Sequence, residues 1–253
     1  AWWTGAELEY GLTDSGAKIL VLDAERYERL VEHLPNCRDL VRVYVSRETE
    51  EIAHPEVSKV EDVIGGANDW ANLPDIPLPA VDIHPDDDAT IFYTSGTTGK
   101  PKGALGTNRG VNSNIMTAAA AGARRFLRRG EMPPAPELVR RLAEAFPKSQ
   151  PGQGWGMTET CATVTSNGAE DYVNRPDSCG PAAAVAELKI MDPNDGKTEL
   201  AVGQVGELWA KGPMVVKGYW NKPEATAQTF VDGWVRTGDL ARLDEEGFCY
   251  IID

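Results

Sequence analysis

Positive charge is scarce in this sequence: 25 lysine and arginine residues stand against 39 aspartate and glutamate residues, which leaves a formal net charge of −14 at pH 7. Nucleic acids and anionic membranes repel a surface of this sign, so we expect neither as a partner. No apolar run has the roughly 20 residues that a membrane-spanning helix needs, and no basic stretch followed by an apolar stretch opens the sequence. We therefore expect a cytoplasmic protein without a transmembrane segment.

Cysteine and histidine are also few. The four cysteines form no Cys-x-x-Cys pair, and only three histidines accompany them. A structural zinc site takes four such ligands at characteristic spacings, so we do not expect zinc. Scattered thiols are typical of proteins in a reducing compartment, which agrees with a cytoplasmic location.

Helices and strands are expected to alternate in the first part of the chain. A capping box at Thr4 and Glu7 predicts a helix that ends near Gly16. The apolar run 18–22 predicts a buried parallel strand. A helix over 25–34 and a strand over 41–45 should follow, and 65–88, which is rich in Pro and Asp, should be a surface connection. This alternation is typical of a doubly wound α/β layer.

Residues 93–103 read Tyr-Thr-Ser-Gly-Thr-Thr-Gly-Lys-Pro-Lys-Gly and follow an apolar stretch that is typical of a strand. Glycine lets backbone N–H groups turn toward a ligand. Hydroxyl and ammonium groups add donors and positive charge, which together suit a polyphosphate. A linker can have a similar composition, but linkers do not usually follow an apolar strand or carry two interleaved lysines. We interpret the run as a phosphate-binding loop with these candidate residues: Thr94, Ser95, Gly96, Thr97, Thr98, Gly99, Lys100 and Lys102.

This loop differs from the common P-loop. That motif has four residues between its first glycine and the Gly-Lys pair, and a Ser or Thr that reaches Mg²⁺. Here two residues separate Gly96 from Gly99, and Pro101 follows Lys100. Proline supplies neither a hydroxyl nor a backbone N–H. The eleven residues instead resemble the phosphate-loop signature of the acyl-adenylate-forming superfamily, which includes acyl-CoA synthetases, luciferases and peptide-synthetase adenylation domains.

A second segment, Gly154-Trp155-Gly156-Met157-Thr158-Glu159-Thr160, is similar to the adenine and magnesium motif of this superfamily. The resemblance implies that Trp155, which Gly154 and Gly156 flank in the sequence, lies against the adenine ring. It also implies that Thr158 contacts the α-phosphate and that Glu159 holds Mg²⁺, a cation that prefers hard oxygen ligands. Taken alone, the same residues would be a turn with a buried aromatic side chain followed by an ordinary helix start.

A third segment, Trp234-Val235-Arg236-Thr237-Gly238-Asp239-Leu240, is similar to the ribose-binding strand of the superfamily. The resemblance implies that Asp239 accepts hydrogen bonds from the ribose hydroxyls, and a carboxylate can accept from two donors at once. The runs 206–212 and 218–221 also match connecting strands of the superfamily, where we expect packing and no chemistry.

The implied fold is that of the large N-terminal domain of these enzymes, a doubly wound α/β layer plus an antiparallel, barrel-like β subdomain. Short strands separated by turns from residue 187 onward favour the second part. We divide the chain into three segments: 1–130 with the phosphate loop, 131–184 as the remnant of a second α/β layer with the adenine motif, and 185–253 as the β-rich subdomain. The mobile C-terminal domain of the superfamily should be absent.

The middle of the chain resembles the superfamily least. Helices are expected over 112–129 and 137–146, yet the span from Gly103 to Gly154 is too short for the second α/β layer and most of the carboxylate pocket. The arginine and lysine that the C-terminal domain contributes have no counterpart. We therefore expect a fragment or a shortened form of a longer protein, which could be inactive alone.

The resemblance implies two-step activation of a carboxylic acid by ATP and Mg²⁺, followed by transfer to CoA, with Lys100, Thr158 and Glu159 as catalytic residues. No general base is needed, because a carboxylic acid is already ionised at pH 7. A ligase for medium- or long-chain fatty acids is the favoured member. A non-catalytic ATP- or AMP-binding fragment, a luciferase-like enzyme and a peptide-synthetase adenylation domain remain alternatives, and assembly into a homo-oligomer stays open.

Overall fold

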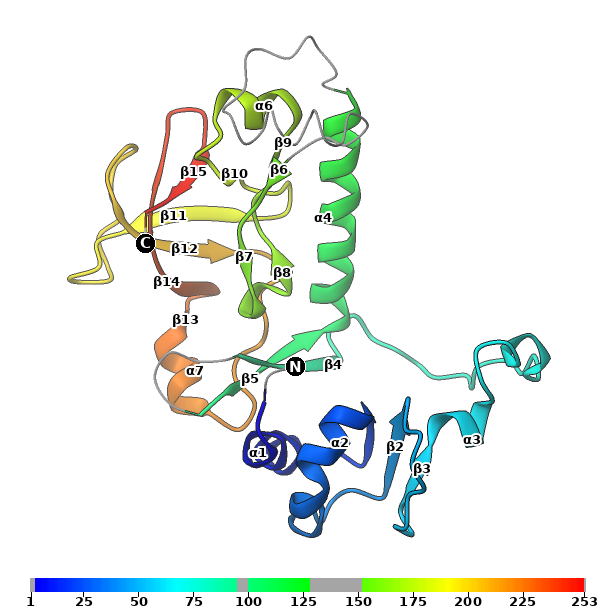
Figure 1. The fold of residues 1–253 in the computed structure, drawn as a ribbon. Coiled ribbons are helices and arrows are strands. Elements are labelled where there is room, and N and C mark those ends of the chain that lie inside the picture. Colours follow the sequence, from blue (N-terminus) through cyan, green and yellow to red (C-terminus); the bar gives the residue numbers. More distant parts are fainter. Residues whose placement is uncertain (1–2, 95–99, 128–151, 253) are drawn as a thin grey trace. The chain divides into compact units, whose positions relative to one another are not determined.

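The computed structural model describes residues 3–94, 100–127 and 152–252. Contacts within the chain divide it into two compact units, Ala1–Asp82 and Ile83–Asp253 (Figure 1). The division of the sequence into three segments follows motifs and not contacts, and it stays a prediction. No helix in the described ranges has both the length and the apolar character to cross a bilayer.

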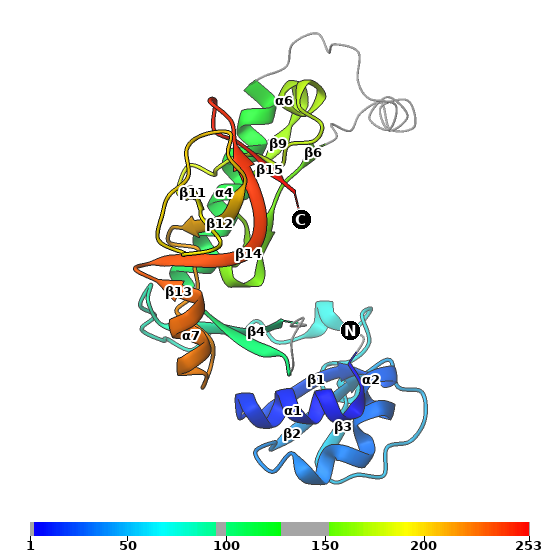
Figure 2. The same cartoon turned by 90° about the vertical axis from the view of Figure 1, so that its left-hand side faces the viewer.

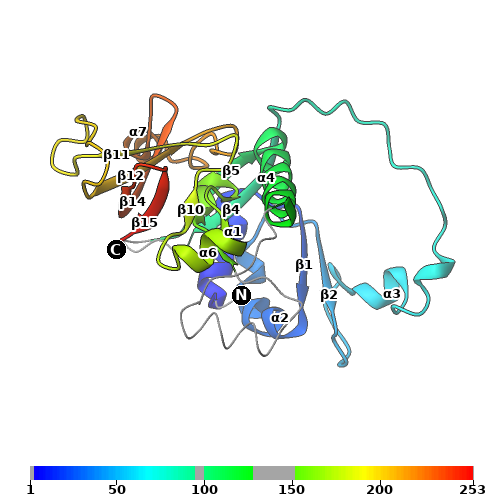
Figure 3. The ribbon, with the colours of Figure 1, turned by 90° about the horizontal axis from the view of Figure 1, so that it is seen from above.

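The first unit has a parallel sheet of three strands in the order β1-β2-β3, and Figure 3 shows β1 and β2 side by side. Its elements are α1 (Gly5–Ser15), β1 (Ile19–Asp23), α2 (Ala24–Leu30), η1 (Val31–Asn36), β2 (Arg42–Ser46), β3 (Val57–Lys59), α3 (Val60–Ile64) and η2 (Trp70–Asn72). The predicted capping box is present, with the Thr4 side chain accepting from the Glu7 backbone, and Gly16 ends the helix in the left-handed region.

The strand predicted at 18–22 is less buried than expected: of its four apolar side chains, two are partly buried and two are exposed. Leu20 and Leu22 pack against a core that includes Leu30 and Val45. Ile19 and Val21 are 63% and 66% exposed, because α1, α2 and η1 pack on the opposite face of the sheet. The parallel pairing was correct, but burial of both faces was wrong, since that requires a layer on each side.

The second unit begins with the hairpin of β4 (Asp88–Thr94) and β5 (Lys102–Thr107), followed by the long helix α4 (Asn108–Leu127). The structure then has β6 (Gly152–Gln153), β7 (Gly156–Met157), η3 (Thr158–Thr160), β8 (Ala162–Thr163), β9 (Asn167–Gly168) and α6 (Ala169–Asn174). The helix predicted at 137–146 lies outside the described residues. α4 stands beside β8 in Figure 1, where the Asn114 amide donates a hydrogen bond to the Thr163 carbonyl at 3.1 Å.

A six-stranded antiparallel sheet completes this unit, and β14 is its long curved strand in Figure 2. Its strands are β10 (Gly180–Pro181), β15 (Phe248–Ile251), β14 (Trp234–Leu243), β12 (Gly206–Lys211) and β11 (Glu187–Met191), in that order, with β13 (Phe230–Val231) beside β14 and α7 (Pro223–Thr229) preceding it. Side chains such as Ile190, Leu208 and Val235 are buried in its core. The predicted β-rich part is therefore present.

Candidate nucleotide-binding site

The β4–β5 hairpin holds both ends of the predicted phosphate loop. Thr94 pairs with Lys102 in the ladder, and the Thr94 hydroxyl donates to the Lys102 carbonyl at 3.4 Å. Gly103 lies opposite Tyr93, and a Cβ atom at Gly103 would come within 2.6 Å of the Ile91 side chain. The hairpin thus fixes where the loop begins and ends. Its central residues, Ser95 to Gly99, lie outside the described residues.

Both glycines of the Gly154-Trp155-Gly156 segment are required by the main chain that runs beside them. A Cβ atom would lie 2.5 Å from the Thr165 carbonyl oxygen at Gly154, and 1.6 Å from the Ala162 carbonyl oxygen at Gly156. Real Cβ atoms do not approach this closely, so any side chain at Gly156 would force β7 away from β8. The motif therefore has a structural reason that is independent of any ligand.

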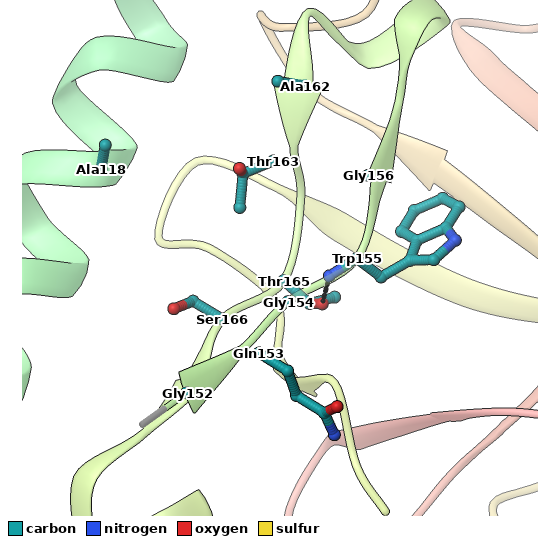
Figure 4. Close-up of a pocket in the computed structure, with 10 residues that line it drawn as sticks. All are labelled: Ala118, Gly152, Gln153, Gly154, Trp155, Gly156, Ala162, Thr163, Thr165 and Ser166. Atoms are coloured by element: carbon teal, nitrogen blue, oxygen red, sulfur yellow. Dashed lines mark hydrogen bonds between the residues drawn. The ribbon is translucent and has the colours of Figure 1, made fainter. Parts of the chain in front are cut away.

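Hydrogen bonds to Val164 and Thr165 hold Trp155 between these glycines, and the Trp155 carbonyl accepts from the Val164 N–H at 2.9 Å. The Trp155 backbone N–H donates to the Thr165 hydroxyl at 2.9 Å, and its carbonyl also accepts from the Thr165 N–H at 3.0 Å (Figure 4). The Thr165 side chain is buried and also donates to the Cys179 carbonyl at 2.9 Å. The position of the indole ring is thus set by the strand pairing.

The indole N–H of Trp155 donates a hydrogen bond to Oδ2 of Asp239 at 2.7 Å, across 84 positions of sequence. Asp239 lies on β14, where Gly238 adopts a left-handed φ of 79°. The Thr237 hydroxyl accepts from the Asp239 N–H at 3.0 Å and donates to the Leu208 carbonyl at 2.7 Å. Two residues that the sequence assigns to adenine and ribose are therefore in direct contact.

Glu159 and Thr158 lie on η3, directly after β7. The Thr160 hydroxyl is within hydrogen-bond distance of the main chain of Met157 and Ala162, and Cys161 closes the turn with a left-handed φ of 51°. Glu159 is only 6% exposed, and among the described residues no lysine or arginine forms an ion pair with it. A buried carboxylate without a cationic partner fits a site for a hard divalent cation such as Mg²⁺.

Tyr219 is the residue of this site that sequence reasoning missed. Its phenol donates to Oε1 of Glu159 at 2.6 Å, although we expected the run 218–221 to serve packing only. Burial raises the pKa of Tyr219, and the hydrogen bond to Glu159 and the charge of that group raise it further, so the phenol stays a donor at neutral pH. Nothing in the local sequence marks this tyrosine, because its partner lies 60 positions away.

A hollow of about 520 Å³ lies between α4 and the segment around Trp155. Small or polar residues line it, namely Ala118, Gly152, Gln153, Gly154, Gly156, Ala162, Thr163, Thr165 and Ser166 together with Trp155. Figure 4 shows the indole ring of Trp155 pointing away from Ala118. The segment around Trp155, between β6 and β7, therefore separates this hollow from the side on which the indole meets Asp239.

A family model described as "AMP-binding enzyme" matches residues 1–128 and 117–220 of the chain. Among curated proteins, the chain is 26% identical to a 4-coumarate–CoA ligase of Narcissus pseudonarcissus, over 99% of this chain and 59% of that protein. It is 28% identical to a medium/long-chain fatty-acid–CoA ligase of Mycobacterium tuberculosis, over 98% of this chain and 56% of that protein. The chain thus spans somewhat more than half the length of these two relatives.

Solved structures have the same fold. A long-chain fatty-acid–CoA ligase of Archaeoglobus fulgidus superposes with a TM-score of 0.76 at 24% identity, covering 100% of this chain and 66% of that chain. The o-succinylbenzoate–CoA synthetase of Bacillus subtilis in complex with AMP gives a TM-score of 0.71 at 23% identity, covering 99% of this chain and 61% of that chain. These likenesses confirm the predicted fold class.

The alignment with the Narcissus ligase runs over 338 positions, which exceeds the 253 residues of this chain. The relative therefore has residues inside the matched region that this chain lacks. The family model also matches in two pieces that meet near residue 120. Both observations agree with the short span expected between the phosphate loop and Gly154.

Proposed function

The chain belongs to the AMP-binding enzyme family, and on that premise we propose that the protein uses ATP and Mg²⁺ to convert a carboxylic acid into an acyl-adenylate, which then reacts with the thiol of CoA. The observation that carries the proposal is the 2.7 Å contact between the Trp155 indole and Asp239. An aromatic platform and a carboxylate side by side suit the two halves of a nucleoside, its base and its ribose.

In the first step, formation of the acyl-adenylate, two negatively charged reactants must come together. A carboxylate must approach the α-phosphorus of a polyanion, so the site has to orient both and neutralise phosphate oxygens. Residues 94–102 would hold the β- and γ-phosphates with Lys100 and Lys102, and Thr158 would contact the α-phosphate. Glu159 would hold Mg²⁺, which supplies positive charge at the phosphate oxygens when bound. Trp155 and Asp239 would position the nucleoside.

We propose an apolar acid as the substrate. The hollow beside Ala118 of α4 is lined mostly by glycine, alanine and threonine, which leave room for an acyl or aryl group across the Trp155 segment from the proposed nucleoside site. Relatives named as ligases for 4-coumarate and for medium- or long-chain fatty acids are both similar to this chain. Our proposal is a medium- or long-chain fatty acid, with a 4-coumarate-like acid as the competing substrate class.

Carboxylate-dependent ATP–pyrophosphate exchange tests the proposal, with separate pools of fatty, hydroxycinnamic and amino acids offered to the whole chain. Exchange with the fatty-acid pool is expected. Exchange with the hydroxycinnamic pool alone would move the substrate to the aromatic class, and exchange with the amino-acid pool would indicate a peptide-synthetase type of adenylation. Light emission with luciferin and ATP would indicate the luciferase-like alternative.

A non-catalytic nucleotide-binding fragment is the second candidate. It is favoured by one observation, that the chain spans 59% of the Narcissus relative and lacks residues inside the matched region. Measurable ATP binding without exchange for any pool would support it. Pyrophosphate release that depends on a carboxylic acid would exclude it.

We also propose a cytoplasmic location. All four cysteines, Cys37, Cys161, Cys179 and Cys249, are free thiols, as is typical of a reducing compartment.

Replacing Asp239 by alanine should weaken ATP binding about 10- to 100-fold, which is the range for losing one or two hydrogen bonds to a charged group. The change also leaves the Trp155 indole N–H without its acceptor. Trp155→Phe keeps a smaller aromatic face and removes that N–H donor, so its effect on ATP binding should be smaller. Isothermal titration with ATP and with 3′-deoxy-ATP separates the two roles.

Wild-type protein should prefer ATP to 3′-deoxy-ATP, and Asp239→Ala should lose this preference. Asp244→Ala provides a control, because Asp244 is a β14–β15 turn residue that accepts from the backbone N–H of Glu246. Equal losses for ATP and 3′-deoxy-ATP in Asp239→Ala, with the preference retained, would remove Asp239 from the ribose site.

A further inference from the structure

The main chain on either side of Tyr219 is fixed by the strand that leaves the phosphate loop. The Leu105 N–H donates to the Gly218 carbonyl at 2.9 Å, and the Trp220 N–H donates to the Gly103 carbonyl at 2.7 Å. Ala104 and Tyr219 form an antiparallel bridge between these two bonds. The residues around Tyr219 thus add a third strand segment beside β5.

The same segment also holds the main chain at Glu159, since the Val216 N–H donates to the Glu159 carbonyl at 3.0 Å. The Tyr219 N–H donates to the Thr226 hydroxyl at 2.9 Å, which ties the segment to α7. Tyr219 therefore has little backbone freedom, and the position of its ring follows the phosphate-loop strand and η3 together.

The Tyr219 side chain contacts both parts of the proposed phosphate and metal site. Its phenol donates to Oε1 of Glu159 at 2.6 Å. The ammonium group of Lys102 lies 5.0 Å from the centre of its ring, within the range of a cation–π interaction. Phe230 packs edge-on against the ring, with 5.5 Å between ring centres. One aromatic side chain thus lies between a buried acid and a loop lysine.

The hydrogen bond restricts the rotation of the Glu159 carboxylate. Oε1 accepts from Tyr219, and among the described residues no group donates to Oε2. Partners outside the ligand set commonly orient carboxylate ligands and set their affinity for a metal ion. A phenol suits this role because it fixes the acid without neutralising its charge, whereas a lysine would compete with the cation.

We propose that Tyr219 is a positioning residue that holds the Glu159 carboxylate for a phosphate-bound divalent cation and links its position to Lys102 of the phosphate loop. The inference rests on the proposed function, because it assumes that Glu159 acts with ATP and Mg²⁺. The proposal assigns a role to Tyr219, which belongs neither to the Trp155–Asp239 pair proposed to bind the nucleoside nor to the lining of the proposed acyl hollow.

The test compares Tyr219→Phe with wild type and with Tyr250→Phe. Tyr219→Phe removes one hydroxyl and keeps the ring over which Lys102 lies. Tyr250 is the matched control, since its phenol also donates to a carboxylate, Asp244, at 3.1 Å, in the β14–β15 hairpin. The dissociation constant of ATP is measured by titration in excess Mg²⁺ and again in excess chelator.

Tyr219→Phe should weaken ATP binding about tenfold in Mg²⁺, the size expected of one hydrogen bond to a charged group, and less than twofold in chelator. Tyr250→Phe should change neither constant. Equal weakening in both conditions would show a structural role for Tyr219, and no change in either would show no role. Each of these two outcomes overturns the proposal.

A double-mutant cycle in urea unfolding tests the contact without any nucleotide. Tyr219→Phe and Glu159→Ala should couple, so that the unfolding equilibrium constant of the double variant differs at least fivefold from the product of the single effects. Absence of coupling would overturn the positioning contact. If the two changes couple but the protein binds no ATP, the Tyr219–Glu159 contact is supported and the proposed function is overturned instead.

Discussion

Replacing Gly156 by alanine is expected to lower the free energy of unfolding of the second unit by about 3 kcal/mol or more and to weaken ATP binding at least tenfold. The added Cβ would lie 1.6 Å from the Ala162 carbonyl oxygen and 2.8 Å from the Thr163 Cα. Both contacts are with main chain, so no side chain can rotate away to relieve them. β7 and β8 must separate, and this movement would displace Glu159, because η3 directly follows β7.

Gly66→Ala, in the first unit, is a control for the glycine-to-alanine change itself, because the nearest atom to its added Cβ would be 3.6 Å away and its φ is not in the left-handed region. This variant should stay within about 0.5 kcal/mol of wild type. Urea unfolding followed by tryptophan fluorescence gives both stabilities, and titration gives ATP affinity. A Gly156→Ala protein with wild-type stability would show that β7 and β8 do not pair as described.

Replacing Glu159 by glutamine is expected to reduce carboxylate-dependent pyrophosphate exchange at least about 100-fold, the scale of losing one group that stabilises a transition state. Folding should not suffer. Glutamine has the same shape, its carbonyl can still accept from Tyr219, and the change removes a charge that is 6% exposed and has no ion-pair partner among the described residues. Stability equal to or above that of wild type is the expected result.

Glu207→Gln makes the comparison sharp, because Glu207 is also 6% exposed but forms an ion pair with Arg236 at 2.9 Å. Removing that charge should lower stability and leave exchange unchanged. If the chain alone shows no exchange, the affinity for ATP in Mg²⁺ serves as the readout for both variants. Loss of function in Glu207→Gln, or its retention in Glu159→Gln, would contradict the assigned roles.

Local signals predicted much of the fold correctly, because their physical causes are local. The Thr4 capping box and Gly16 bound α1 as expected, and the apolar runs at 18–22 and 41–45 form a parallel pair. Exposure of Ile19 and Val21 could not be predicted, since it depends on which layers pack against the sheet. An apolar run indicates that both faces of a strand are apolar, but it does not indicate which helices or strands pack against each face.

For the candidate site, too, the sequence predicted single residues but not the contacts between them. Motifs brought Trp155, Glu159 and Asp239 to attention one at a time, but their spacing in sequence carries no information on the 2.7 Å contact between the first and the last. Tyr219 was missed altogether, because its role depends on a pairing between its segment and β5 that joins distant parts of the chain. The centre of the phosphate loop, Ser95 to Gly99, stays a prediction.

The strand order of the large sheet has a consequence for synthesis on the ribosome. β15 lies between β10 and β14, so β10 has no neighbour on that side until residues 248–251 emerge. Trp155 precedes Asp239 by 84 residues, which at about 5–20 residues per second corresponds to several seconds of translation. From the synthesis of Gly180 to that of Asp239, the unpaired edge of β10 and the Trp155 indole without its acceptor are present together. The large sheet therefore has its complete set of pairings only after residues 248–251 have emerged.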